Sequence, residues 1–117
     1  MGRKVSDGRS VRVTVPQNTT IEAGKFYLLD GFFGLAVQSV ATGTGETAEV
    51  ILNCEQAEYE TSQITTTDDF NKGEPVYWND ATKLLTTQAG TDNRLVGRVT
   101  QAKDANNVIW FNLGPQV

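Results

Sequence analysis

The sequence predicts an all-β protein, a small barrel or sandwich built from two pseudo-repeated β-units with an extended N-terminal arm. Short runs rich in β-branched and aromatic residues recur between turn residues, and no useful stretch has the apolar period of a helix. The clearest sign is a repetition: residues 72–80 have the same layout as residues 23–31. In both stretches a glycine precedes a short apolar or aromatic strand, and an acidic residue at a turn follows it.

The length and the charge pattern define the expected organisation. A chain of 117 residues allows one domain, which buries roughly two-thirds of its unfolded surface. We expect a flexible or partner-ordered arm over residues 1–10 and a single β-domain over residues 11–117. Residues 1–12 carry four cations against Asp7, a net charge of +3, so the remainder must carry −7 of the total of −4. A basic arm on an acidic body suggests contact with a negatively charged partner.

The first β-unit is expected over about residues 21–54, after an opening strand. Residues 11–15 alternate between apolar and polar, which predicts a half-buried strand that Pro16 ends. Residues 21–29 predict a strand pair that turns at Ala23 and Gly24. A glycine-marked strand at 33–37, a flexible loop at 42–46 and a closing strand at 47–54 complete the unit.

The second β-unit is expected over about residues 70–114 and repeats this order. Strands are predicted at 76–78, 83–87, 94–99 and 108–113, separated by turn residues. Residues 94–99 correspond to 33–37, and residues 108–113 correspond to 49–53. Residues 55–60 are expected to continue the closing strand of the first unit or to bridge the two halves.

Two pairs of adjacent aromatic residues are candidates for contact with other subunits. Phe32 and Phe33 lie side by side in a predicted strand, and so do Tyr77 and Trp78. Successive side chains of a strand point to opposite faces, so if one member of a pair is in the core the other is on the surface or in an interface. We therefore take Phe32, Phe33, Tyr77 and Trp78 as candidates for a contact with other subunits.

The residues that support catalysis or cofactor binding are sparse. The chain has no histidine, and its one cysteine, Cys54, lies in an apolar strand where we interpret it as a small buried hydrophobe. Five glutamates between residues 46 and 60 lack the layout of a calcium loop and are interpreted as a solvated face. The glycine-containing stretches at 24–25 and 43–45 fail the tests for a phosphate loop and a dinucleotide turn. We expect no enzyme activity, no metal, no cofactor and no small-molecule substrate.

The basic arm leaves a nucleic-acid partner open as an alternative. Its cations, Arg3, Lys4, Arg9 and Arg12, could contact phosphates, but the acidic body would repel the rest of a duplex. The aromatic residues of the strands are not interleaved with basic residues, as they are in stacking platforms. Nucleic acid is therefore not the expected partner. No apolar stretch is long enough to span a membrane, and no membrane contact is expected.

Five segments, taken in order, resemble the family of small phage capsid decoration or cement proteins of the DUF2190 type. They are IEAG at 21–24, FGLAV at 33–37, KGEPVYWND at 72–80, LVGRV at 95–99 and VIWFNL at 108–113. The resemblance covers about residues 11–114, and its specificity comes from the order and spacing of short segments. The chain departs from the family pattern at its bulky segment 31–34.

The resemblance implies a structural virion protein with no catalytic role. Such a protein is made in the bacterial host cytoplasm and binds the outer surface of a phage capsid, where it clamps neighbouring major capsid protein subunits, usually as a homotrimer. In this chain the implied capsid-binding residues lie in and just after the arm: Arg3, Lys4, Val5, Arg9, Val11, Arg12 and Val13. The resemblance makes the four aromatic residues Phe32, Phe33, Tyr77 and Trp78 candidates for a trimer or capsid contact. The arm would add a strand to an exposed capsid sheet edge while its cations pair with capsid carboxylates.

Overall fold

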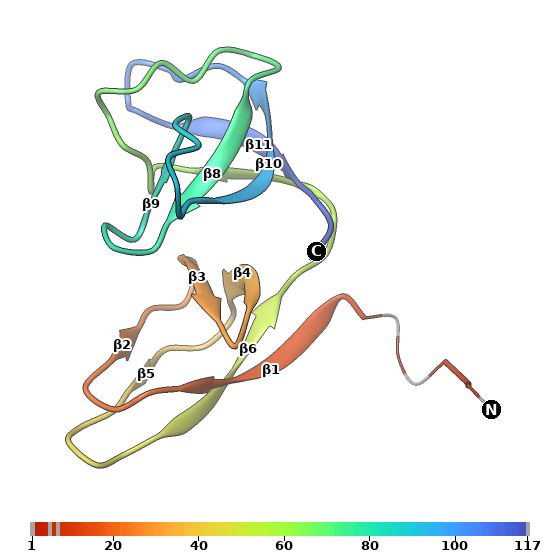
Figure 1. Cartoon of the computed structure of the whole chain (residues 1–117), viewed down its shortest axis with the longest axis vertical. Helices are drawn as coiled ribbons and strands as arrows, with labels where there is room; N and C mark the ends of the chain where they lie inside the picture. The colour runs from red at the N-terminus through yellow and green to blue at the C-terminus, as the bar shows by residue number, and fades with distance from the viewer. Residues whose placement is uncertain (1, 5, 7, 117) are drawn as a thin grey trace. The chain divides into compact units, whose positions relative to one another are not determined.

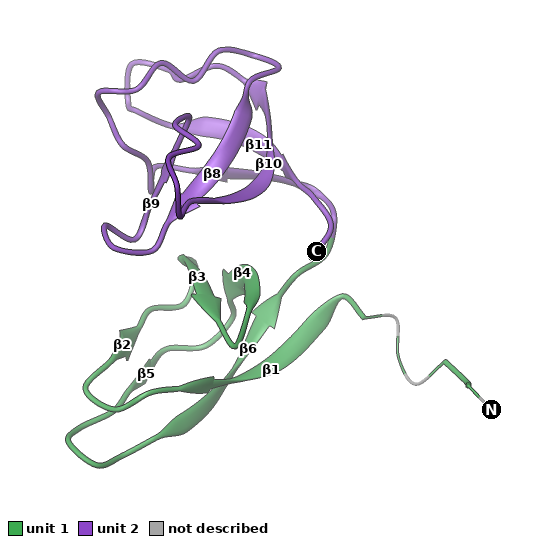
Figure 2. Ribbon diagram, in the orientation of Figure 1, with its two compact units in different colours: residues 1–55 green, residues 56–117 purple. Residues whose placement is uncertain are grey.

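The computed structural model confirms the all-β class. It describes residues 2–4, 6 and 8–116, and across these residues the secondary structure consists of β-strands and turns. The chain divides into two compact units, residues 1–55 and residues 56–117 (Figure 2). Our prediction of a single domain over residues 11–117 stays a prediction, and the two units are described separately below.

Unit 1 is built around a curled antiparallel sheet (Figure 1). Its strands are β1 (Ser10–Val15), β2 (Thr20–Ile21), β3 (Phe26–Leu29), β4 (Phe32–Ala36), β5 (Val40–Ala41) and β6 (Ala48–Asn53). The sheet has the order β1-β6-β4-β3, so β1 and β3 are its edge strands, while β2 and β5 form a separate two-stranded ribbon. Near the C-terminal end of β1, the edge of the strand is already hydrogen-bonded within the chain, because the Thr14 N–H donates to Asp30 Oδ2 at 2.7 Å.

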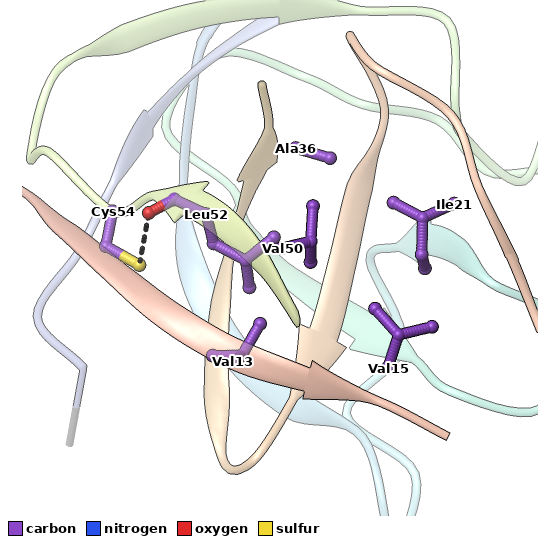
Figure 3. Close-up of a cluster of buried hydrophobic side chains, with 7 residues drawn as sticks. All are labelled: Val13, Val15, Ile21, Ala36, Val50, Leu52 and Cys54. Carbon is purple, nitrogen blue, oxygen red and sulfur yellow. Dashed lines mark hydrogen bonds between the residues drawn. The ribbon is translucent and has the colours of Figure 1, made fainter. Parts of the chain in front are cut away.

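A cluster of aliphatic side chains fills one face of this sheet (Figure 3). Its buried members are Val13, Val15, Ile21, Ala36, Val50, Leu52 and Cys54. The alternation predicted for residues 11–15 is confirmed, because Val13 and Val15 are buried while Arg12 and Thr14 are exposed. Cys54 is 6% exposed and its thiol lies 3.8 Å from the Leu52 carbonyl, which confirms its interpretation as a buried small hydrophobe.

Unit 2 contains a five-stranded antiparallel sheet with the order β7-β11-β10-β8-β9. The strands are β7 (Glu58–Thr61), β8 (Pro75–Asn79), β9 (Leu84–Thr86), β10 (Arg94–Gln101) and β11 (Ile109–Leu113). Alternate residues of β11 are buried, as a strand with one solvated face requires. We expected residues 55–60 to continue the closing strand of the first unit or to bridge the two halves. Residues 55–57 lie between β6 and β7, and Glu58 and Glu60 belong to β7, an edge strand of this sheet.

The two units share one strand order. Four strands of unit 1, in the order β1-β6-β4-β3, correspond one by one to four strands of unit 2, in the order β7-β11-β10-β8. Every neighbouring pair in both orders is antiparallel. The glycine turns also match. Gly24 N–H donates to the Ala36 carbonyl and Gly73 N–H donates to the Val99 carbonyl, each at 2.9 Å, and both glycines have positive φ. The repetition read in residues 23–31 and 72–80 is thus a repetition of backbone hydrogen bonding.

A second pair of glycines occupies corresponding points of β4 and β10. A Cβ at Gly34 would lie 2.7 Å from the Asn53 carbonyl oxygen, and a Cβ at Gly97 would lie still closer to the Asn112 carbonyl oxygen. In each case the main chain of the neighbouring strand occupies the space of a side chain. Glycine is therefore required at both positions for the strands to approach this closely.

Candidate functional site

The described residues that precede β1 form an exposed basic segment, which we call the arm (residues 2–9). Every described residue of the arm is exposed, including Arg3, Lys4 and Arg9, and the segment leads away from the sheet of unit 1 (Figure 1). Val5, also predicted to bind the capsid, lies outside the described residues. The described residues of the arm therefore present cationic side chains on backbone that belongs to no strand and bends at Ser6 and Arg9.

The base of the arm is held to unit 1 at Arg9. Its carbonyl accepts a hydrogen bond from the Cys54 N–H at 2.7 Å, which extends the pairing of β1 with β6 by one residue. The Arg9 guanidinium Nε lies 4.0 Å from Glu55 Oε1, with both side chains well exposed. An ion pair this exposed contributes little to stability, so the main-chain bond marks where the arm ends.

The remaining predicted capsid-binding residues belong to the sheet rather than to the arm. Val11, Arg12 and Val13 lie in β1 and pair with Leu52, Ile51 and Val50 of β6. Val13 is buried in the apolar cluster, whereas the Arg12 side chain is exposed on the opposite face. Of these three residues, Arg12 has the most accessible side chain, and Val11 is half-buried.

The four candidate aromatic residues separate into core and surface. Phe33 is 0% exposed and stacks on Phe26 with ring centroids 5.4 Å apart, while Phe32 is 37% exposed. Trp78 is 1% exposed and Tyr77 is half-buried. A fully buried ring offers a partner no contact area, so Phe33 and Trp78 act as core residues, and the accessible candidates are Phe32 and Tyr77.

Two exposed apolar side chains on unit 2 were not predicted from the sequence. Trp110 is 38% exposed and Leu95 is 55% exposed. Both lie on the face of the sheet opposite Phe111 and Val96, because their strands alternate. Within β11 the buried positions are 109, 111 and 113, and this period of two was the signal that could have placed Trp110 on the outer face.

A shallow concavity of about 200 Å³ lies at the β7 edge of the same face. It is lined by Glu58, Tyr59, Glu60 and Trp110, and Trp110 is directly opposite Glu60 in the register of β7 and β11. A second concavity of similar volume in unit 1 is lined by Arg12, Gln38, Glu49, Val50 and Ile51. Neither joins an acid to a nucleophile, and among the described residues no group of three His, Cys, Asp or Glu side chains could hold a metal ion.

The fold shifts the pKa of Asp80, at the turn after β8. Partial burial acts to raise this pKa, but hydrogen bonds from Lys83 Nζ at 2.8 Å and Trp78 Nε1 at 3.1 Å, together with the Lys83 charge, outweigh burial. The pKa of Asp80 therefore lies below its ordinary value. The carboxylate fixes the indole of a core tryptophan at the turn after β8, which is a structural role.

The model of the phage cement protein family matches residues 5–113, and the chain therefore belongs to that family. Its members are structural proteins that stabilise phage capsids, and the family is not one of enzymes. The matched span includes both units and begins within the arm. Neither the curated proteins nor the solved structures searched give a match. The described residues include no helix long and apolar enough to cross a bilayer.

Proposed function

We propose that the protein binds the outer surface of a phage capsid and stabilises the shell by clamping neighbouring major capsid protein subunits. Membership of the phage cement protein family supports a capsid-stabilising role. The observation that carries the finer proposal is the arm, an exposed segment with Arg3, Lys4 and Arg9. A clamp must contact subunits beyond the footprint of its folded body, and an extended arm provides that reach.

The arm suits an acidic capsid surface with an open strand edge. Extended backbone can add a strand to a neighbouring sheet and gain main-chain hydrogen bonds, while arginine and lysine pair with carboxylates at the rim. Gly2 and Gly8 carry no side chain, and a Cβ at either position would meet no atom within 4 Å. The arm can therefore lie close to a partner's backbone without a steric conflict of its own.

We further propose that the protein acts as a homotrimer on the shell. Three arms that bind together give a higher effective affinity than one, because the second and third contacts form at high local concentration. Phe32 and Tyr77 are the accessible aromatic residues for contact with the capsid or between copies. The alternative of a nucleic-acid partner has no support beyond the arm's charge.

Deletion of residues 2–8 tests the role of the arm. The deletion keeps Arg9 and its hydrogen bond to Cys54, so unit 1 should fold normally. The measurement is cosedimentation of the purified protein with assembled phage shells that lack it. We expect the wild type to saturate the shells and the truncated protein to remain in the supernatant.

A matched control separates charge from sequence. The double substitution Arg3→Lys with Lys4→Arg keeps both positive charges and should bind shells like the wild type, whereas Arg3→Glu with Lys4→Glu should not. Full shell occupancy by the truncated protein would show that the arm is not the capsid-binding element. Binding of duplex DNA with a steep salt dependence, in place of shells, would favour the nucleic-acid alternative.

A further inference from the structure

The repeated strand order makes β1 and β7 structurally equivalent edge strands with opposite charge. Each pairs with the closing strand of its own unit, β1 with β6 and β7 with β11. Alignment through these pairings places Ser10 at the position of Glu58 and Arg12 at the position of Glu60. All four side chains are exposed. The two strands thus present the same backbone geometry with a cation on one and carboxylates on the other.

The open part of each edge is the N-terminal half of the strand. In β1 the Arg9 carbonyl bonds toward β6, so by alternation the main-chain groups of Ser10 and Arg12 point away from the sheet. In β7 the Ala57 carbonyl accepts from the Leu113 N–H, so the main-chain groups of Glu58 and Glu60 point away in the same manner.

Bonds within the chain limit the open part of each edge on its C-terminal side. In β1 the Thr14 N–H is bonded to Asp30, and just after β7 the Ser62 carbonyl accepts from the Ile64 N–H at 2.9 Å. Among the described residues, the outward main-chain groups of Ser10 and Arg12 in β1 and of Glu58 and Glu60 in β7 therefore define matching three-residue segments. A partner strand has the same length of backbone to pair with in each unit.

We propose that the β1 edge of one copy pairs antiparallel with the β7 edge of a second copy. In this register Arg12 lies opposite Glu58, Val11 lies opposite Tyr59, and Ser10 lies opposite Glu60. Because the two strands are equivalent in their units, antiparallel pairing of their edges keeps the inner faces of the two sheets on the same side. The half-buried Val11 and Tyr59 then cover each other, and the charged side chains meet on the solvent face.

The concavity beside β7 gives the cation a further partner. It is lined by Glu58, Tyr59, Glu60 and Trp110. Glu58 is a diagonal neighbour of Trp110 across the pairing of β7 with β11, so an arginine opposite Glu58 extends across β7 to reach the indole ring. A guanidinium over an indole face, with carboxylates on both sides, is stabilised by cation–π attraction as well as by charge. The exposed Trp110, which the fold of the single chain does not explain, is covered in this contact.

The contact is heterologous, since it joins different surfaces of the two copies. Each copy then has a β1 edge for one neighbour and a β7 edge for another, and a heterologous contact closes into a ring when its rotation allows. This inference rests on the proposed function only in taking copies of the chain to associate. The contact between copies then involves Arg12 and β7, and the arm remains available to bind the shell.

Charge reversal on one edge, and then on both, tests the pairing. Arg12→Glu alone, and Glu58→Lys with Glu60→Lys alone, each place like charges across the contact. The variant that carries all three substitutions restores opposite charges. Sedimentation velocity over a range of protein concentrations measures association, and thermal unfolding monitored by circular dichroism checks that these exposed positions leave the fold intact.

We expect each one-sided variant to associate at least about tenfold more weakly than the wild type, and the triple variant to recover most of that loss. Trp110→Ala should also weaken association. Unchanged association of the one-sided variants, failure of the triple variant to recover, or a wild type that stays monomeric would each overturn the pairing. Shell binding by the protein that lacks residues 2–8 is a separate readout, because that deletion keeps Ser10 to Arg12.

Discussion

Replacement of Gly97 by alanine adds one methyl group at the closest approach of two strands in unit 2. The new Cβ would meet the Asn112 carbonyl oxygen at less than the 2.7 Å found for the corresponding contact of Gly34, and it would lie 3.2 Å from a ring carbon of Phe111. Ordinary contacts of a Cβ begin at 3.4 Å. The atom that obstructs it belongs to the main chain, so no side-chain rotation relieves the overlap.

The loss of stability in Gly97→Ala depends on how far β10 and β11 must separate. β10 pairs with β11 through Gly97 and Leu113 and through Arg98 and Asn112, and separating the strands weakens this pairing. Overpacking in a close-packed interior costs about 1–3 kcal/mol, and here the rigid partner places the cost at about 3 kcal/mol or more. For a chain of this size that corresponds to a fall in Tm of roughly 10 °C or more.

The assay is thermal unfolding of three alanine variants followed by circular dichroism. Gly114 is the matched control, because a Cβ there would meet the Val96 carbonyl oxygen at 3.5 Å, an ordinary contact. We expect the loss of stability to decrease in the order Gly97→Ala, Gly34→Ala, Gly114→Ala. A Gly97→Ala variant within about 1 kcal/mol of the wild type would refute the reasoning, since the cost of overpacking would then be absent.

Two further predictions concern single side chains. Cys54→Ser should destabilise unit 1 by about 1–3 kcal/mol, because a hydroxyl replaces a thiol in an apolar cluster, whereas in the wild type a thiol reagent should label Cys54 only upon unfolding; rapid labelling of the native protein would contradict its burial. Because the pKa of Asp80 is lowered in the fold, its contribution to stability is present above its unfolded pKa and is lost as the pH falls through the folded value. The stability difference between the wild type and Asp80→Asn should therefore shrink below about pH 4, as denaturant titrations at several pH values would show; a pH-independent difference would contradict this account.

The sequence predicted the repeated elements because their signals are local. Glycine at 24 and 73, with apolar strands after them, reflects a turn of positive φ followed by a half-buried strand, and both properties depend on neighbouring residues. The role of residues 58–61 could not be read in this way. A glutamate-rich strand such as β7 becomes a strand through its pairing with β11, about 50 residues later in the chain.

The candidate site was predicted only in part, because local sequence signals show which residues are charged but not which apolar residues are covered. The exposure of Arg3, Lys4 and Arg9 follows from their charge, and it agrees with the structure. For adjacent aromatic residues the pattern of a strand shows only that they face opposite ways, and burial depends on what covers each face. This is why Phe32 is exposed and Phe33 is core, and why Trp110 was not recognised as a surface residue.

The central claim is that this chain strengthens a phage shell by binding to its outside. The most direct measurement compares the temperature at which DNA-filled heads that lack the protein release their DNA, before and after saturation with the purified protein. We expect a higher release temperature for heads saturated with the wild-type protein than for bare heads. The protein that lacks residues 2–8 should leave the release temperature unchanged. Equal release temperatures for bare heads and for heads saturated with the wild-type protein would contradict it.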